Sequence, residues 1–118
     1  MSYDIAVWEG DRPADDAAAG RCFRDLYDQY MGTNEKAPPT REIVAFVAAL
    51  LQRWPDLSED EEDLSPWSAD PLIGEARGPL IYFPMRYSMA EEASDYAAQV
   101  ATAMGLTCFD PQEMRLRP

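Results

Sequence analysis

The densest chemical feature of the chain is a run of five consecutive carboxylates between two tryptophans. The run lies within residues 56–70, which contain no lysine or arginine. Such a segment repels itself and predicts an exposed, mobile loop. Negative charge speeds association with a basic protein, and a tryptophan can anchor the contact. We therefore predict a partner-binding surface made of Trp54, Glu59, Asp60, Glu61, Glu62, Asp63 and Trp67.

Two readings of this loop stay open. The carboxylates of residues 59–63 either meet a basic partner or only keep the loop solvated. Trp67 stands between Pro66 and Ser68. Its ring either plugs the edge of the core or contacts the partner directly.

A second set of chemical residues follows the predicted strands. Glu9 and Asp110 each come after an apolar run, as does Arg86. In a parallel sheet these side chains would gather beyond the carboxyl ends of the strands, where two acids could share acid and base roles or hold Mg²⁺. In an antiparallel sheet Glu9 moves to the opposite end, and Asp110 would approach Asp4 and Arg86 as a structural ion pair. Arg86 alone could also hold a carboxylate or phosphate.

The composition argues against most known catalytic designs. The chain has no histidine, which excludes histidine-based triads and most zinc-hydrolase ligand sets. Phosphate-binding loops, dinucleotide fingerprints and nucleophile elbows are missing from the sequence. Cys22 and Cys108 lie in apolar patterns and are expected to be reduced packing residues. We predict a protein without a cofactor and without catalytic residues of its own.

The elements that position these residues follow from hydrophobic periodicity. Thr40 is the expected N-cap of the second helix, and residues 88–91 form a capping-box sequence before the third. The predicted strands are 3–8, 71–73, 79–83 and 106–109, and the predicted helices are 14–31, 40–54 and 88–104. The last residues, 110–118, can add a short extended piece.

The resulting order, β-α-α-β-β-α-β, predicts an α+β fold in a single domain spanning residues 1–118. A split β-α-β arrangement gives a ferredoxin-like, four-stranded antiparallel sheet with helices on one face. The alternative is a small α/β protein with a parallel sheet that omits residues 71–73.

The formal net charge of −12 bears on partners. It disfavours nucleic acids and anionic membranes, because phosphate contacts need clustered lysine and arginine. The first residues lack the pattern of a secretory signal, and the longest apolar stretch is too short to span a bilayer. We therefore expect a cytoplasmic protein with a basic protein partner. The oligomeric state is left open, including a structural role as a homo-oligomer subunit.

Residues 3–9, 65–67, 81–83 and 105–112 resemble the corresponding segments of a group of small bacterial proteins. That group is similar to the immunity proteins encoded near polymorphic toxins. The resemblance implies a cytosolic protein that binds and blocks one toxin. It carries over no catalytic residue.

Overall fold

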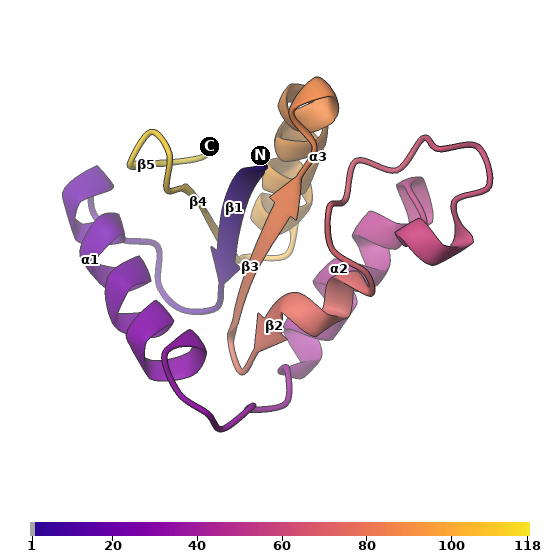
Figure 1. The fold of residues 1–118 in the computed structure, drawn as a ribbon. Helices are drawn as coiled ribbons and strands as arrows, with labels where there is room; N and C mark the ends of the chain where they lie inside the picture. Colours follow the sequence, from indigo (N-terminus) through magenta and orange to yellow (C-terminus); the bar gives the residue numbers. More distant parts are fainter. Residues whose placement is uncertain (1) are drawn as a thin grey trace.

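The computed structural model describes residues 2–118 and contains one five-stranded sheet with three α-helices (Figure 1). The strands are β1 (Tyr3–Trp8), β2 (Ala76–Arg77), β3 (Leu80–Met85), β4 (Thr107–Asp110) and β5 (Arg115–Leu116). The helices are α1 (Asp16–Leu26), α2 (Arg41–Arg53) and α3 (Ala90–Ala103), and a π-helical turn, Tyr27–Met31, continues α1. Within residues 2–118, no helix is both long and apolar enough to cross a membrane.

The sheet is antiparallel throughout, in the order β2-β3-β1-β4-β5. Central strand β1 pairs with β3 from Tyr3 opposite Met85 to Trp8 opposite Leu80. On its other edge β1 pairs with β4, with Ala6 opposite Phe109. The expected α+β class and antiparallel pairing are confirmed, and the parallel alternative is wrong. The sheet has five strands instead of the expected four, because the C-terminal residues form β5.

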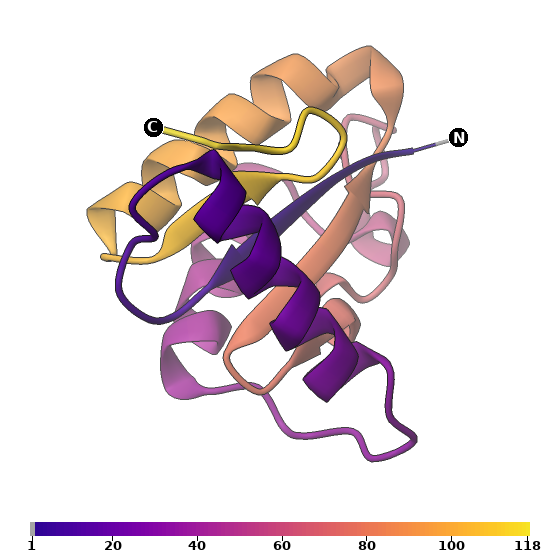
Figure 2. The same cartoon turned by 90° about the vertical axis from the view of Figure 1, so that its left-hand side faces the viewer.

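The helices cover both faces of the sheet, which corrects the expectation that they share one face. Ile5 and Val7 of β1 point into a core beneath α2 and α3, whereas Ala6 and Trp8 point into a second core beneath α1. Figures 1 and 2 show α1 crossing the strands on the side opposite α2 and α3. The physical reason is that β1 is apolar on both faces from Ile5 onward, so each face must be covered.

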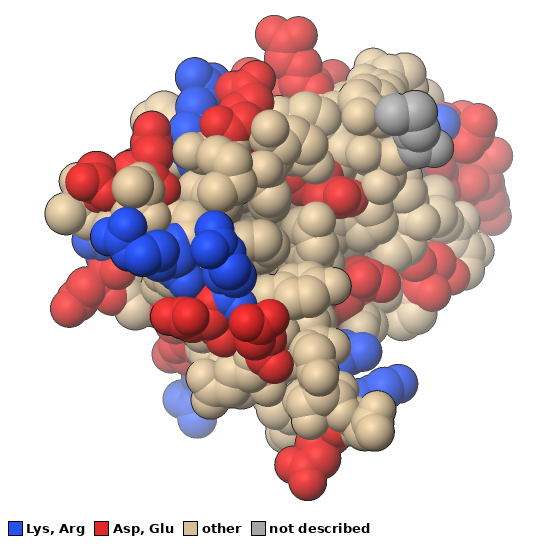
Figure 3. Space-filling view, turned by 60° about the vertical axis from the view of Figure 1, so that its left-hand side comes forward, with Lys and Arg blue, Asp and Glu red and all other residues tan. Residues whose placement is uncertain are grey.

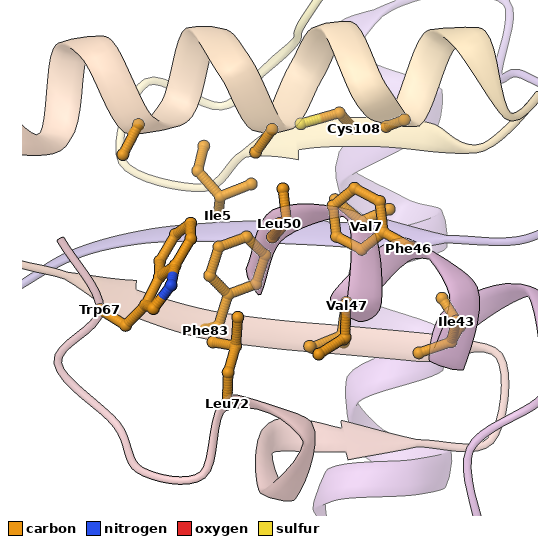
Figure 4. Packing of buried hydrophobic residues seen from close by; sticks show 14 of the residues in the cluster. Ile5, Val7, Ile43, Phe46, Val47, Leu50, Trp67, Leu72, Phe83 and Cys108 are labelled. Atoms are coloured by element: carbon orange, nitrogen blue, oxygen red, sulfur yellow. The ribbon is translucent and has the colours of Figure 1, made fainter. Parts of the chain in front are cut away.

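The larger core lies between the sheet and the α2–α3 layer. Phe46 and Leu50 of α2 meet Phe83 of β3 there, and Ala97 of α3 closes the core from above. Trp67, which comes from the acidic loop, joins the same cluster (Figure 4). Burial of large side chains of this kind stabilises a fold by about 1.5–3 kcal/mol each relative to exposure.

Helix capping agrees with the sequence expectation at α2 and departs from it at α3, and the structure adds a cap at α1 that was not predicted. The Asp15 carboxylate caps α1 by accepting from the Ala18 amide at 2.8 Å. The Thr40 hydroxyl caps α2 by accepting from the Ile43 amide at 3.4 Å, as expected. The expected capping box at Ser88 is not formed, because residues 87–89 make a 3-10 turn and α3 begins one residue later.

The strand expected at residues 71–73 is also wrong. Leu72–Glu75 form a 3-10 helix, and the edge strand β2 follows at Ala76–Arg77. The Leu72 amide donates to the Asp56 carboxylate at 2.8 Å, and the Gly74 amide donates to the Pro71 carbonyl at 2.9 Å. These donors are used before they can reach a neighbouring strand, so sheet pairing starts only afterwards.

Candidate functional site

The acidic loop, residues 56–70, is fastened to the core by Trp54 and Trp67. The Trp67 Nε1–H donates to the Trp54 carbonyl oxygen at 3.0 Å. The two rings pack edge to face, with their centroids 5.8 Å apart. Trp67 also pairs with Met85 at the end of β3. Since Trp67 is only 1% exposed, it anchors the loop in the core and does not present a contact surface. Of the two roles considered for Trp67, the structure places it as the core plug.

Asp60 stabilises the loop through hydrogen bonds to the loop backbone. Its two carboxylate oxygens accept from the Leu64 amide at 3.0 Å and from the Ser65 amide at 2.7 Å. These hydrogen bonds, with the bond from Ser65 the stronger influence, lower the pKa of Asp60 below its ordinary value. Asp60 therefore keeps its negative charge, but its oxygens serve the loop backbone.

Arg86 binds the C-terminal part of the loop, at residues 63–66. Its guanidinium donates to the Ser65 carbonyl oxygen and to the Asp63 carboxylate, the latter at 3.1 Å. Its backbone amide donates to the Pro66 carbonyl at 2.8 Å. The Asp63 side chain remains 87% exposed despite this ion pair. Arg86 is thus committed to the acidic loop and not to Asp110.

The remaining carboxylates of the run face solvent. Glu59, Glu61 and Glu62 are exposed, and within residues 2–118 none of them forms an ion pair. In Figure 1 the loop projects beyond α2 at the edge of the molecule. On the face shown in Figure 3, by contrast, basic side chains lie among acidic ones. Within residues 2–118, ion pairing in the acidic loop therefore reaches only Asp63, through Arg86.

A hollow of about 470 Å³ lies beside these carboxylates. Its lining combines apolar residues, from the segment after α2, the acidic loop and the turn before α3, with carboxylates of the loop. The lining residues are Arg53, Trp54, Pro55, Glu59, Asp60, Glu61, Glu62, Leu64 and Met89. Sequence reasoning missed Arg53, Pro55, Leu64 and Met89. The available signals were the position of Arg53 and Pro55 on either side of Trp54 and of Leu64 directly after five acids. Met89 joins the site only through the fold.

The alternative site of Glu9, Arg86 and Asp110 is not assembled. Glu9 follows β1, and its carboxylate accepts from the Thr40 hydroxyl. Asp110 ends β4 and Arg86 follows β3, so both lie at the opposite end of the antiparallel sheet from Glu9. The expected pairing of Asp110 with Arg86 is also replaced, because Arg86 binds the acidic loop.

Asp110 instead organises the turn between β4 and β5. Its buried carboxylate accepts from the Tyr3 hydroxyl, from the Gln112 amide at 2.9 Å and from the Gln112 side chain at 2.8 Å. Burial and the hydrogen bond to Asp110 raise the pKa of Tyr3 to about 12. Gln112 also donates to the Asp4 carbonyl at 2.7 Å, so the cluster ties the C-terminal hairpin to β1.

Across residues 2–118, no three acidic or cysteine side chains lie close enough together to hold a metal ion. Comparison with protein families, curated proteins and solved structures found no match for the chain.

Proposed function

We propose that the protein is a non-enzymatic binding protein that neutralises a basic protein partner through the acidic loop. The partner is a toxin or another basic enzyme, and the protein acts as its immunity protein or inhibitor in the cytoplasm. The scaffold for this role is a ferredoxin-like core of β2, β3, β1 and β4, extended by β5 and by α1 on the second face.

The observation that carries the proposal is a set of three exposed carboxylates without a basic partner, on a hydrogen-bonded loop. Glu59, Glu61 and Glu62 are exposed and unpaired within residues 2–118, on a backbone held by Asp60 and Arg86. A preorganised surface loses less conformational entropy on binding than a mobile one. Negative charge at the rim raises the association rate with a basic surface and disfavours acidic competitors.

The test is affinity capture from a lysate of the native host at low ionic strength. The wild type is compared with a loop variant, Glu59→Lys/Glu61→Lys/Glu62→Lys, and with a control variant, Asp25→Lys/Asp28→Lys/Glu35→Lys. All six positions are exposed, and each triple change moves the formal net charge by +6, from −12 to −6. We expect one basic protein to be retained by the wild type and the control and lost by the loop variant. Equal retention by all three proteins would argue against the acidic loop.

A further inference from the structure

We infer that the hollow beside the acidic loop receives one long cationic side chain, an arginine or lysine, that protrudes from the partner protein. This inference rests on the proposed function and identifies the chemical group that the site recognises. The hollow, of about 470 Å³, falls within the usual range of about 300–1,000 Å³ for sites that enclose small ligands. It therefore has room for one extended side chain and part of its backbone.

The lining of the hollow offers partners for both parts of such a side chain, the aliphatic stem and the charged head. Pro55, Leu64 and Met89 supply apolar surface, and Glu59, Glu61 and Glu62 supply the carboxylates, here called the acidic rim. Trp54 also lines the hollow, but it is only 8% exposed and Arg53 lies over its ring. Lysine and arginine bury an aliphatic stem against apolar surface while the charged head stays among polar groups. A wholly apolar side chain would leave the carboxylates without a partner, and a small cation would leave the apolar side uncovered.

Leu64 is the most exposed of the apolar residues that line the hollow. Its side chain is 54% exposed, more than any other exposed large hydrophobic residue described. The Asp60 carboxylate holds its backbone amide at 3.0 Å, so Leu64 has a defined place beside the acidic rim.

Arg53 shows how a guanidinium fits this part of the surface. It lies 4.3 Å from the ring centre of Trp54 and 4.7 Å from that of Tyr96, and it pairs with Glu92 at 2.8 Å. Its charge is thereby matched by a carboxylate outside the rim. Arg53 leaves Glu59, Glu61 and Glu62 free for a cation from the partner, since none of them is paired within residues 2–118.

The inference can be tested without the partner, with short peptides as probes. We would titrate the full-length protein with acetyl-Gly-Ser-Xaa-Ser-Gly-amide, where Xaa is arginine, lysine or citrulline, and follow the backbone amides by two-dimensional NMR. Citrulline keeps the shape of arginine and removes its charge. We expect the arginine or lysine peptide to shift the amides of residues 53–64 and 89 in a saturable manner, and the citrulline peptide to bind at least about tenfold more weakly.

Two variants separate the hollow from general attraction to a negative protein. Leu64→Ala removes apolar surface from the hollow, and Val44→Ala removes a similarly exposed apolar side chain, 46% exposed, from α2. We expect Leu64→Ala to weaken binding of the cationic peptide about threefold or more, while Val44→Ala leaves it unchanged.

Three results would overturn the inference: no saturable shifts in the hollow, equal binding of citrulline, or no effect of Leu64→Ala. Failure here is distinguishable from failure of the proposed function. If the peptides do not bind but the loop variant still loses a basic partner, only the cationic side chain in the hollow is refuted. If the loop variant retains the partner, the proposed function fails whatever the peptides do.

Discussion

The Trp67 indole N–H donates to the Trp54 carbonyl oxygen at 3.0 Å, across thirteen positions of the chain. This bond joins the end of α2 to the residue at which the chain re-enters the core. The carboxylates between them repel one another and would favour an open chain. A buried hydrogen bond and an edge-to-face aromatic contact oppose that repulsion, so an acidic segment can hold a defined shape.

Trp67→Phe should destabilise the protein by more than the loss of ring volume. The change removes the indole donor and leaves the Trp54 carbonyl oxygen without it. Trp8→Phe is the matched control, because Trp8 is also 1% exposed but its Nε1–H has no hydrogen-bond partner within residues 2–118. In urea unfolding, we expect Trp67→Phe to lower the free energy of unfolding by about 1 kcal/mol more than Trp8→Phe. Equal losses would mean that this hydrogen bond does not hold the loop.

Arg86→Lys should loosen the acidic loop without unfolding the domain. One guanidinium nitrogen of Arg86, Nη2, donates to both the Ser65 carbonyl and the Asp63 carboxylate. Lysine keeps the charge, but its ammonium ends one bond short of the position of Nη2, and it is more strongly hydrated than a guanidinium. We expect hydrogen exchange at the Leu64 and Ser65 amides to accelerate about tenfold, equivalent to about 1.4 kcal/mol of local stability. Arg24→Lys, at an exposed position of α1, is the control and should leave these amides unchanged. Unaltered exchange in Arg86→Lys would remove Arg86 from the support of the loop.

The contribution of Asp60 to the stability of the protein should be present at neutral pH and lost in acid. Hydrogen bonds from the Ser65 and Leu64 amides lower its pKa in the folded protein. The stabilisation is therefore fully present above the ordinary aspartate pKa, about 3.9, and is lost as the pH falls through the lowered value. Asp60→Asn leaves one of the two amides facing a side-chain NH₂ group, so it should be less stable than the wild type near neutral pH.

Urea unfolding of the wild type and Asp60→Asn between about pH 7 and about pH 2.5 measures this dependence. The difference in the free energy of unfolding should stay constant near neutral pH and shrink in acid. Asp28→Asn, at an exposed position away from the acidic loop, is the control and should follow the wild type. A gap between wild type and Asp60→Asn that does not change with pH would contradict the assigned role of the carboxylate.

Much of the fold could be predicted from local sequence signals. The alternation at residues 3–8 matches the observed β1, Tyr3–Trp8, and Thr40 caps α2 as its type and position predicted. Both features depend on contacts within a few residues. The position of α1 depends on the whole sheet: Ala6 and Trp8 need cover as much as Ile5 and Val7 do, and only the assembled fold shows which helix supplies it.

The candidate site also has features that the sequence predicts and features that only the fold reveals. Charge and composition identified the acidic loop, and the placement of Glu59, Glu61 and Glu62 at the surface agrees with the expected exposure. The supporting bonds from Arg86 to Asp63 and from Leu72 to Asp56 could not be predicted from sequence spacing, because Arg86 follows β3 and Leu72 lies shortly before the edge strand β2. The mobility of the segment stays a prediction; it was made from the charge pattern alone, without these long-range bonds.

The most direct test of the account is the affinity for the captured basic partner, measured with the wild type, the loop variant and the charge-matched control at about 50 mM and about 300 mM salt. We predict that the loop variant binds at least about tenfold more weakly than the control at low salt, because three attractive contacts become repulsive. Raising the salt should weaken the wild type and narrow its advantage over the loop variant. An affinity that ignores both the loop reversal and the salt would contradict the claim that the acidic loop holds the partner.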